Sequence, residues 1–139
     1  MAIFLNNKVG FKIATVDLSD HVTTFTLNRV SDQLEVTAMG DTSHKFVSGL
    51  SADTITVSFL NDTGAGSVLA TLQAAYGTTV AFSALQNTDD AVSATNVLYT
   101  GTILVDNLTD INGAVSDEAM IDVTFTCNSK TDVATTGTF

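Results

Sequence analysis

At 139 residues the chain is long enough for one domain with its own hydrophobic core, yet only 14% of its residues are charged, against roughly 25% in an average soluble domain. Fifteen acidic and five basic side chains give a formal net charge of -10, and the basic ones are scattered, which disfavours tight binding of nucleic acid. The single cysteine, Cys127, excludes an intrachain disulfide and a cysteine-based zinc site, while abundant Thr, Ser, Ala and Gly in place of charged surface predict self-assembly.

The amino terminus and the apolar runs give no sign of membrane targeting. The first residues, MAIFLNNKVGFK, contain an apolar stretch of only four residues and no cleavage pattern, so we do not expect a secretory signal. No apolar run approaches the ~18 to 20 residues that span a bilayer, so we expect no membrane anchor.

Short alternating runs of β-branched and aromatic residues, with no proline anywhere, predict a mainly β fold. In ADTITVSFL, Ile55, Val57 and Phe59 share one face of a strand and alternate with polar residues, and AMIDVTFTCN repeats this pattern near the carboxyl end. Further strands are predicted at residues 11–17, 22–29, 33–39, 78–85 and 96–106.

One helix is predicted at about residues 66–76, between the strands. Within GAGSVLATLQAAYG, Ser67 is positioned to cap the amino end and Gly77 to end the helix. The expected apolar stripe consists of Val68, Leu69, Leu72, Ala75 and Tyr76. Residues 1–128 are expected to form a single β domain, and residues 129–139 a flexible or partner-docked tail.

Several residue clusters are candidates for catalytic, metal-binding or phosphate-binding sites. Asp41, Ser43 and His44 could supply a nucleophile and a base, but neighbours in a turn point in divergent directions, so turn residues are expected instead. His21 and His44 lack a metal-ligand spacing. The Gly-Ala-Gly-Ser run at 64–67 lacks the third glycine of a phosphate loop. No catalytic residue, cofactor or metal is therefore expected.

The stretch VTAMGDTSHKF, followed by SGL and the strand DTITVSF, resembles a pattern of the major tail tube proteins of long non-contractile, siphovirus-type bacteriophage tails. That pattern is a strand, a Thr-x-x-Gly-Asp-Thr/Ser loop, Gly-Leu and a second strand. The likeness is closest over about residues 15–60, where VDLSDHVTTFTLNR is similar to the early Asp-Leu-Ser segment of the family. Beyond that, the order of elements agrees.

The resemblance implies a β-sandwich or barrel-like protomer with one flanking helix, and a structural virion protein rather than an enzyme. Copies would form hexameric rings that stack into a tail tube, an electronegative conduit through which double-stranded DNA passes into the host without specific binding. Tape measure, terminator and baseplate proteins would be its further partners. Assembly would take place in the host bacterial cytoplasm, and the product would be part of the phage tail.

The resemblance also assigns roles to residues. A loop between the two early strands would dock onto a neighbouring subunit or ring, with Gly40 permitting its turn and Asp41 and Thr42 holding it by local hydrogen bonds. The expected docking residues are Met39, Gly40, Asp41, Thr42, Phe46, Val47 and Leu50. Glu35 and Asp122 are candidates for carboxylates that line the lumen of the tube.

Other functions stay open from the sequence. Related β folds include tail terminators, baseplate hub rings and the tubes of contractile tails and secretion machines. A non-viral small-ligand-binding β-barrel would need an aromatic cluster around a cavity, yet only Tyr76 and Tyr99 accompany the phenylalanines and no tryptophan is present. A hydrolase would lose activity, without losing assembly, on mutation of Asp41 or His44.

Overall fold

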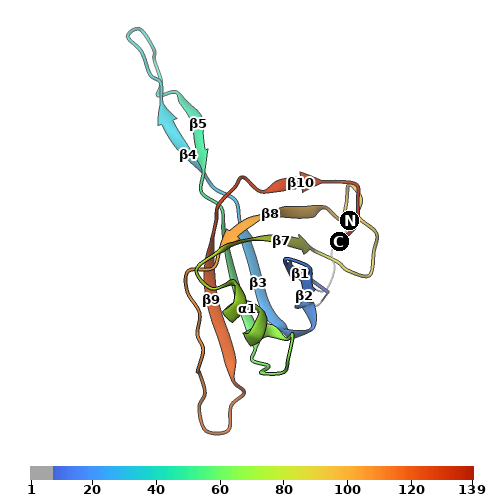
Figure 1. Ribbon diagram of the computed structural model, residues 1–139. Helices are drawn as coiled ribbons and strands as arrows, with labels where there is room; N and C mark the ends of the chain where they lie inside the picture. Colours follow the sequence, from blue (N-terminus) through green and yellow to red (C-terminus); the bar gives the residue numbers. More distant parts are fainter. Residues whose placement is uncertain (1–7) are drawn as a thin grey trace.

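The computed structural model describes residues 8–139 and shows two packed β layers with a hairpin projecting from one end (Figure 1). The question of a secretory signal concerns chiefly residues 1–7, which lie outside the described residues. One layer contains β1 (Gly10–Ile13), β2 (Val16–Asp17), β7 (Thr79–Leu85), β8 (Leu98–Leu104) and β10 (Asp132–Ala134). The other contains β3 (Val22–Asn28), β6 (Thr54–Leu60) and β9 (Met120–Cys127).

The two layers are parts of one antiparallel sheet that turns a corner. The strand order is β2-β1-β7-β8-β9-β6-β3, with β10 added to β8. At the corner, β8 and β9 are joined through the pairs Ile103↔Cys127 and Leu104↔Thr126, whereas β6 and β9 pair along seven positions. The short junction lets the two groups of strands fold face to face, as in a β-sandwich.

The core lies between these layers because the alternating strands turn their apolar faces toward each other. Phe11 of β1 lies near both Phe25 of β3 and Phe59 of β6, with ring centroids 5.0 Å and 6.1 Å apart. β1, next to one end of the strand order, therefore meets β3, the other end, across the core. Buried residues from both layers and the helix fill it, namely Ile13, Leu18, Ile55, Val57, Val68, Leu72, Phe82, Ile103, Val105, Ile121, Val123 and Phe125. The predicted mainly β sandwich is confirmed.

Helix α1 (Val68–Ala75) lies within the predicted range and buries Val68, Leu72 and Ala75 on one face. Gly77 has a φ of +80°, the left-handed conformation predicted for the residue that ends the helix. Two details were wrong. Tyr76 leaves the helix with a ψ of 130° and is exposed rather than part of the apolar stripe, and the hydroxyl of Ser67 makes no capping hydrogen bond.

Two predicted strands, the predicted docking loop and the predicted tail differ from the structure. Residues 11–17 form two strands, because Ala14 has a φ of +54° and turns the chain back so that Ile13 pairs with Val16. The strand predicted at 33–39 is β4 (Ser31–Glu35), which ends earlier. Residues expected in a docking loop instead form β5 (Phe46–Ser51), which pairs with β4. Of the expected tail, Asp132–Ala134 forms β10 on β8 of the same chain.

Candidate assembly interfaces

The arm, defined here as residues 31–51, is a two-stranded hairpin that extends away from the sandwich (Figure 1). β4 and β5 form a separate sheet in which Leu34 pairs with Val47 and Glu35 with Phe46. Strand alternation places Leu34 and Val47 on one face and Phe46 on the other, and a shift in register interrupts the alternation before Leu50. All four side chains are exposed, Leu50 by 80%. An isolated hairpin of this kind is at best marginally stable in water, so the arm is suited to be covered by a partner.

The arm tip is held by Asp41, as the sequence predicted. Its carboxylate accepts hydrogen bonds from the backbone N–H of Ala38 at 2.8 Å and from Lys45 Nζ at 2.7 Å. The Lys45 ammonium, followed by the Ala38 N–H, lowers the pKa of Asp41 below its ordinary value. Gly40 has a φ of +90°, a conformation that glycine adopts without the steric cost of a side chain. Met39, beside it, projects fully into solvent.

The remaining polar residues of the arm form a second cluster. Glu35 Oε2 accepts hydrogen bonds from His44 Nδ1 and from Thr37 Oγ1, and Thr37 Oγ1 in turn accepts one from the backbone N–H of Lys45. Asp41 and His44 thus bind different partners, and no hydrogen bond or ion pair joins either of them to Ser43 among residues 8–139. Thr42, predicted to help hold the turn, makes no side-chain hydrogen bond with the described part of the chain.

Asp53 joins the base of the arm to the carboxyl-terminal corner of the sandwich, a role that the sequence did not reveal. It is only 4% exposed, and its carboxylate accepts hydrogen bonds from the backbone N–H groups of Val30 at 3.1 Å and Thr131 at 3.0 Å. Burial raises the pKa of Asp53, but these bonds and the nearby charge of Arg29 outweigh burial and bring it below its ordinary value. A buried carboxylate between three segments is a structural anchor.

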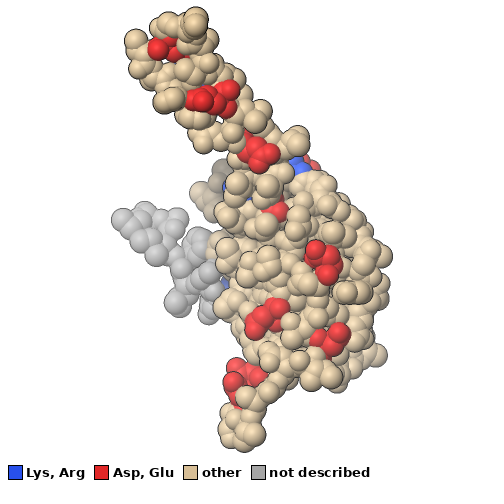
Figure 2. All heavy atoms as spheres, turned by 90° about the vertical axis from the view of Figure 1, so that its left-hand side faces the viewer, with Lys and Arg blue, Asp and Glu red and all other residues tan. Residues whose placement is uncertain are grey.

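The outer face of the β3-β6-β9 layer carries rows of hydroxyl side chains. Cross-strand pairing aligns Thr24 with Ser58 and Asp122 in one row. A second row contains Thr26, Thr56 and Thr124, and a third Asn28, Thr54 and Thr126. Asp122 is thus the carboxylate on a face of uncharged polar residues, whereas Glu35, the other predicted lumen carboxylate, lies on the arm. Figure 2 views this side of the molecule and shows carboxylates at intervals on a mainly uncharged surface.

The two outer edges of the β3-β6-β9 layer differ in whether other parts of the chain cover them. β3 ends the strand order, so its outer edge pairs with no strand among residues 8–139. The edge of β9 is instead covered by the chain that follows β8: Asn107 Nδ2 donates to the carbonyl of Thr124 at 2.7 Å, and Thr109 Oγ1 to that of Asp122 at 3.2 Å. An open strand edge is a template for pairing with another chain.

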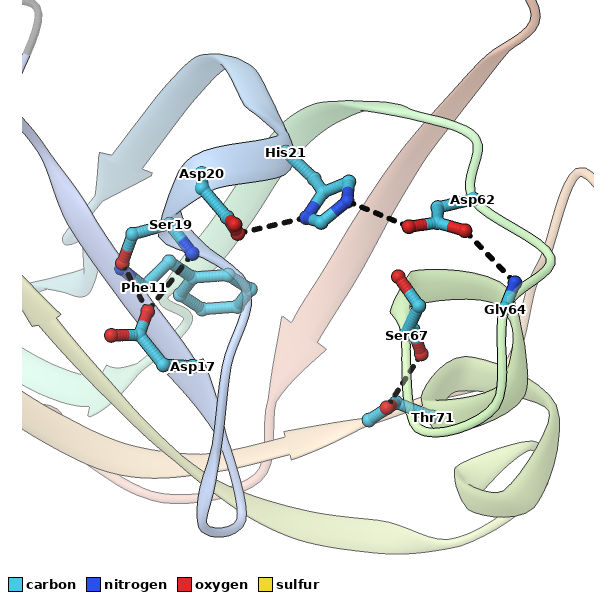
Figure 3. A network of polar contacts seen from close by, with 9 residues as sticks. All are labelled: Phe11, Asp17, Ser19, Asp20, His21, Asp62, Gly64, Ser67 and Thr71. Atoms are coloured by element: carbon cyan, nitrogen blue, oxygen red, sulfur yellow. Dashed lines mark hydrogen bonds and ion pairs between the residues drawn. The ribbon is translucent and has the colours of Figure 1, made fainter.

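A polar network joins η1 to the segment before α1 at the end of the sandwich opposite the arm (Figure 3). His21, at the end of η1 (Ser19–His21), contacts Asp20 Oδ1 through Nδ1 at 2.8 Å and Asp62 Oδ2 through Nε2 at 3.0 Å. Burial lowers the pKa of His21, but the two carboxylates outweigh burial and raise it above its ordinary value. Asp62 also accepts the Gly64 N–H, so the Gly-Ala-Gly-Ser run is held as a turn before α1.

Three further features of residues 8–139 bear on function. No group of three or more His, Cys, Asp or Glu side chains within residues 8–139 is arranged to hold a metal ion. Over the same range, the structure contains no helix of the length and apolar character needed to cross a bilayer. Core side chains that include Phe11, Phe59, Phe82 and Phe125 fill the centre of the space between the layers, where a small-ligand-binding barrel would need its cavity. A hollow of about 360 Å³ opens at the side of this space, with a lining that includes Phe25, Leu27, Ala84, Leu85 and Tyr99.

The same fold occurs in solved structures of tails. A chain of the virion of a native gene transfer agent particle has a TM-score of 0.68 at 9% identity, over 95% of this chain and 99% of that one. A chain of the SPP1 tail tube has a TM-score of 0.69 at 12% identity, over 90% and 76% of the two chains. A chain from the tail of an empty gene transfer agent particle, determined with C6 symmetry, has a TM-score of 0.66 at 9% identity, over 96% and 99%.

No protein-family model and no curated protein matches the sequence. At identities of 9 to 12%, the structural likeness establishes the fold and nothing finer. The resemblance to major tail tube proteins is confirmed at that level: the chain has a tail tube fold.

Proposed function

We propose that this chain, with its tail tube fold, is the repeating subunit of a phage-type tail tube. Six copies form a ring, rings stack into a hollow tube, and double-stranded DNA passes through the tube into the host. The observation that carries the proposal is the arm, which exposes apolar side chains on both of its faces and has no core of its own. The C6 symmetry of one tail with this fold supports a ring of six.

The strand edges suit the closing of a ring. In the proposed assembly, the open edge of β3 meets the β9 side of the neighbouring copy, so that the inner layers continue from copy to copy around the channel. This arrangement removes the exposed edge, which would otherwise invite uncontrolled pairing. The segment containing Asn107 and Thr109 then lies at the seam between two copies.

The hydroxyl-bearing face of β3, β6 and β9 is the proposed lining of the lumen, with Asp122 as its carboxylate. Each copy also brings a formal net charge of -10 to the ring. Phosphates passing through such a channel meet neutral hydroxyls and like charge, and no basic patch that would retain them. The lining therefore suits passage of DNA rather than binding. Glu35, held by His44 on the arm, is a second lumen candidate only if the arm turns inward in the assembly.

The arm is the proposed docking element between copies. Met39 projects at its tip, Phe46, Val47 and Leu50 supply apolar anchors along β5, and Gly40, Asp41 and Thr42 form the turn between the strands. In the virion the tube would also contact tape measure, terminator and baseplate proteins, after assembly in the host cytoplasm. Nothing in this role requires catalysis, a metal or a cofactor.

Electron microscopy of the purified protein over a range of concentrations, with light scattering on the same samples, tests the proposal. Hollow tubes with an axial repeat support it. Six-fold rings that never lengthen would instead favour a terminator or a baseplate hub. A monomer at every concentration, even with a tail initiator complex added, would overturn the tube proposal.

A further inference from the structure

A second projection lies at the end of the sandwich opposite the arm. The lower loop, defined here as residues 106–119, joins β8 to β9 and extends past the body of the molecule (Figure 1). Ile111 and Val115 on this loop are 93% and 98% exposed. The same loop carries the exposed carboxylates Asp110, Asp117 and Glu118. Apolar side chains so fully in water on an acidic loop are suited to a partner with apolar and basic groups.

The base of the arm carries basic and apolar side chains, which complement the acidic and apolar side chains of the lower loop. A hollow of about 240 Å³ lies there, and its lining includes Arg29, Val30, Ser48 and Lys130. Asp53 is also in the lining, but its carboxylate is already bound by two backbone N–H groups. Leu34 adjoins the hollow beside Gly49. Figure 2 shows basic side chains close to the base of the arm.

Arg29 and Lys130 differ from the other basic residues of the described chain in their side-chain contacts. Lys8 lies 3.7 Å from Asp89, Lys45 2.7 Å from Asp41, and Lys12 4.5 Å from the centroid of the Phe139 ring. Within residues 8–139, neither Arg29 nor Lys130 forms an ion pair. Arg29 and Lys130 thus have neither an ion pair nor a contact with an aromatic ring among these residues, and both line one hollow, at the end opposite the lower loop.

We propose that the lower loop of one copy docks into the hollow at the base of the arm of the next copy along the tube. Asp117 and Glu118 approach Arg29 and Lys130, while Ile111 and Val115 are covered by the apolar side chains of Val30 and Leu34. The occupant is a second copy because the two surfaces are complementary in charge and lie at opposite ends of the molecule. Such a head-to-tail contact repeats without closing and builds a stack. This inference rests on the proposed tube function.

Disulfide trapping between two different variants tests the contact directly. One variant carries Val115→Cys and the other Ser48→Cys, both with Cys127→Ser, and the two are mixed in equal amounts and oxidised. A disulfide needs Cβ atoms within about 4.5 Å, so it reports close approach. Ser43→Cys, on the same arm but at its tip, replaces Ser48→Cys as the matched control. We expect at least ten times more heterodimer with Ser48→Cys than with Ser43→Cys.

The same experiment is repeated with native Cys127 retained. It shows whether a folding defect of the Cys127→Ser variant affects the yield of heterodimer. Burial, with the charge of Asp53, raises the pKa of the Cys127 thiol, which keeps its own oxidation slow.

Lys130→Glu on the Ser48→Cys copy should reduce the heterodimer several-fold, and Glu118→Lys on the Val115→Cys copy should restore it. Heterodimer yields that do not respond to either charge reversal would overturn the assigned pairing.

Electron microscopy of the same mixtures without oxidant separates the two proposals. Tubes without the specific heterodimer would overturn the docking of the lower loop and leave the tube function standing. A specific heterodimer without rings or tubes would support the contact and count against the tube. If neither forms, both proposals fail.

Discussion

Leu34 of β4 and Val47 of β5 lie directly opposite each other across the arm, and about half of each side chain is exposed. In the sandwich, pairs of this kind are covered by the opposing layer, as Val57 and Val123 are. The arm has no such cover within the described chain. Its apolar pairs therefore contribute to stability chiefly when another surface buries them.

Substitutions on the arm should separate assembly from folding. Leu50→Asp and Met39→Ser remove exposed apolar groups that contact no core, so the thermal midpoint of unfolding should change by no more than about 2 °C. The concentration needed for tubes to grow should rise at least tenfold, measured by light scattering and electron microscopy. Ser43→Ala, an exposed position on the same arm, is the control. Normal tube growth of Leu50→Asp would contradict the role of the arm.

Replacing Asp53 should destabilise the fold far more than replacing an exposed acid nearby. Asp53→Ala leaves the N–H groups of Val30 and Thr131 without their acceptor in a buried place, at a cost of about 2 to 3 kcal/mol in the free energy of unfolding. Asp53→Asn keeps one acceptor oxygen and should cost less. Asp32→Ala, exposed on β4, should stay within about 0.5 kcal/mol. Urea unfolding measures all three, and equal effects at Asp53 and Asp32 would refute the anchor.

The stability contributed by His21 should depend on pH in a defined direction. Its pKa in the folded state is raised by Asp20 and Asp62, so protonation favours folding. The contribution is complete below the ordinary value of 6.5 and is lost as pH rises through the raised pKa. The difference in unfolding free energy between the native protein and His21→Gln should therefore be larger near about pH 5.5 than near about pH 8.5. A difference that grows with pH would contradict this assignment.

A positive charge on the hydroxyl-bearing face should convert passage of DNA into retention. Asp122 is exposed on that face, so Asp122→Lys should leave folding and tube growth unchanged. In assembled tubes it would replace a repelling charge by an attracting one in every copy. Co-sedimentation of short double-stranded DNA with tubes should rise severalfold and fall again with added salt. Asp89→Lys, at a loop away from this face, is the control, and equal retention by both variants would place the lumen elsewhere.

The sequence determined the elements that depend on local patterns. Alternation with a period of two predicted β6 and β9, because each strand places one face in the core and one in water. The spacing of Val68, Leu72 and Ala75 predicted α1, and the low charge predicted assembly. The Gly-Asp turn at Gly40 and Asp41 was also readable, since its geometry needs only a glycine and a nearby carboxylate.

Only the tertiary structure decided how these elements combine into surfaces. β5 was missed because Phe46 and Val47 are adjacent, Gly49 interrupts the run, and no core imposes an alternation on it. The role of Asp53 depends on Val30 and Thr131, which are 23 and 78 residues away in the chain. The hydroxyl rows, the open β3 edge and the hollow at the base of the arm likewise arise from register between distant strands. Such relationships follow from long-range pairing, which local composition does not encode.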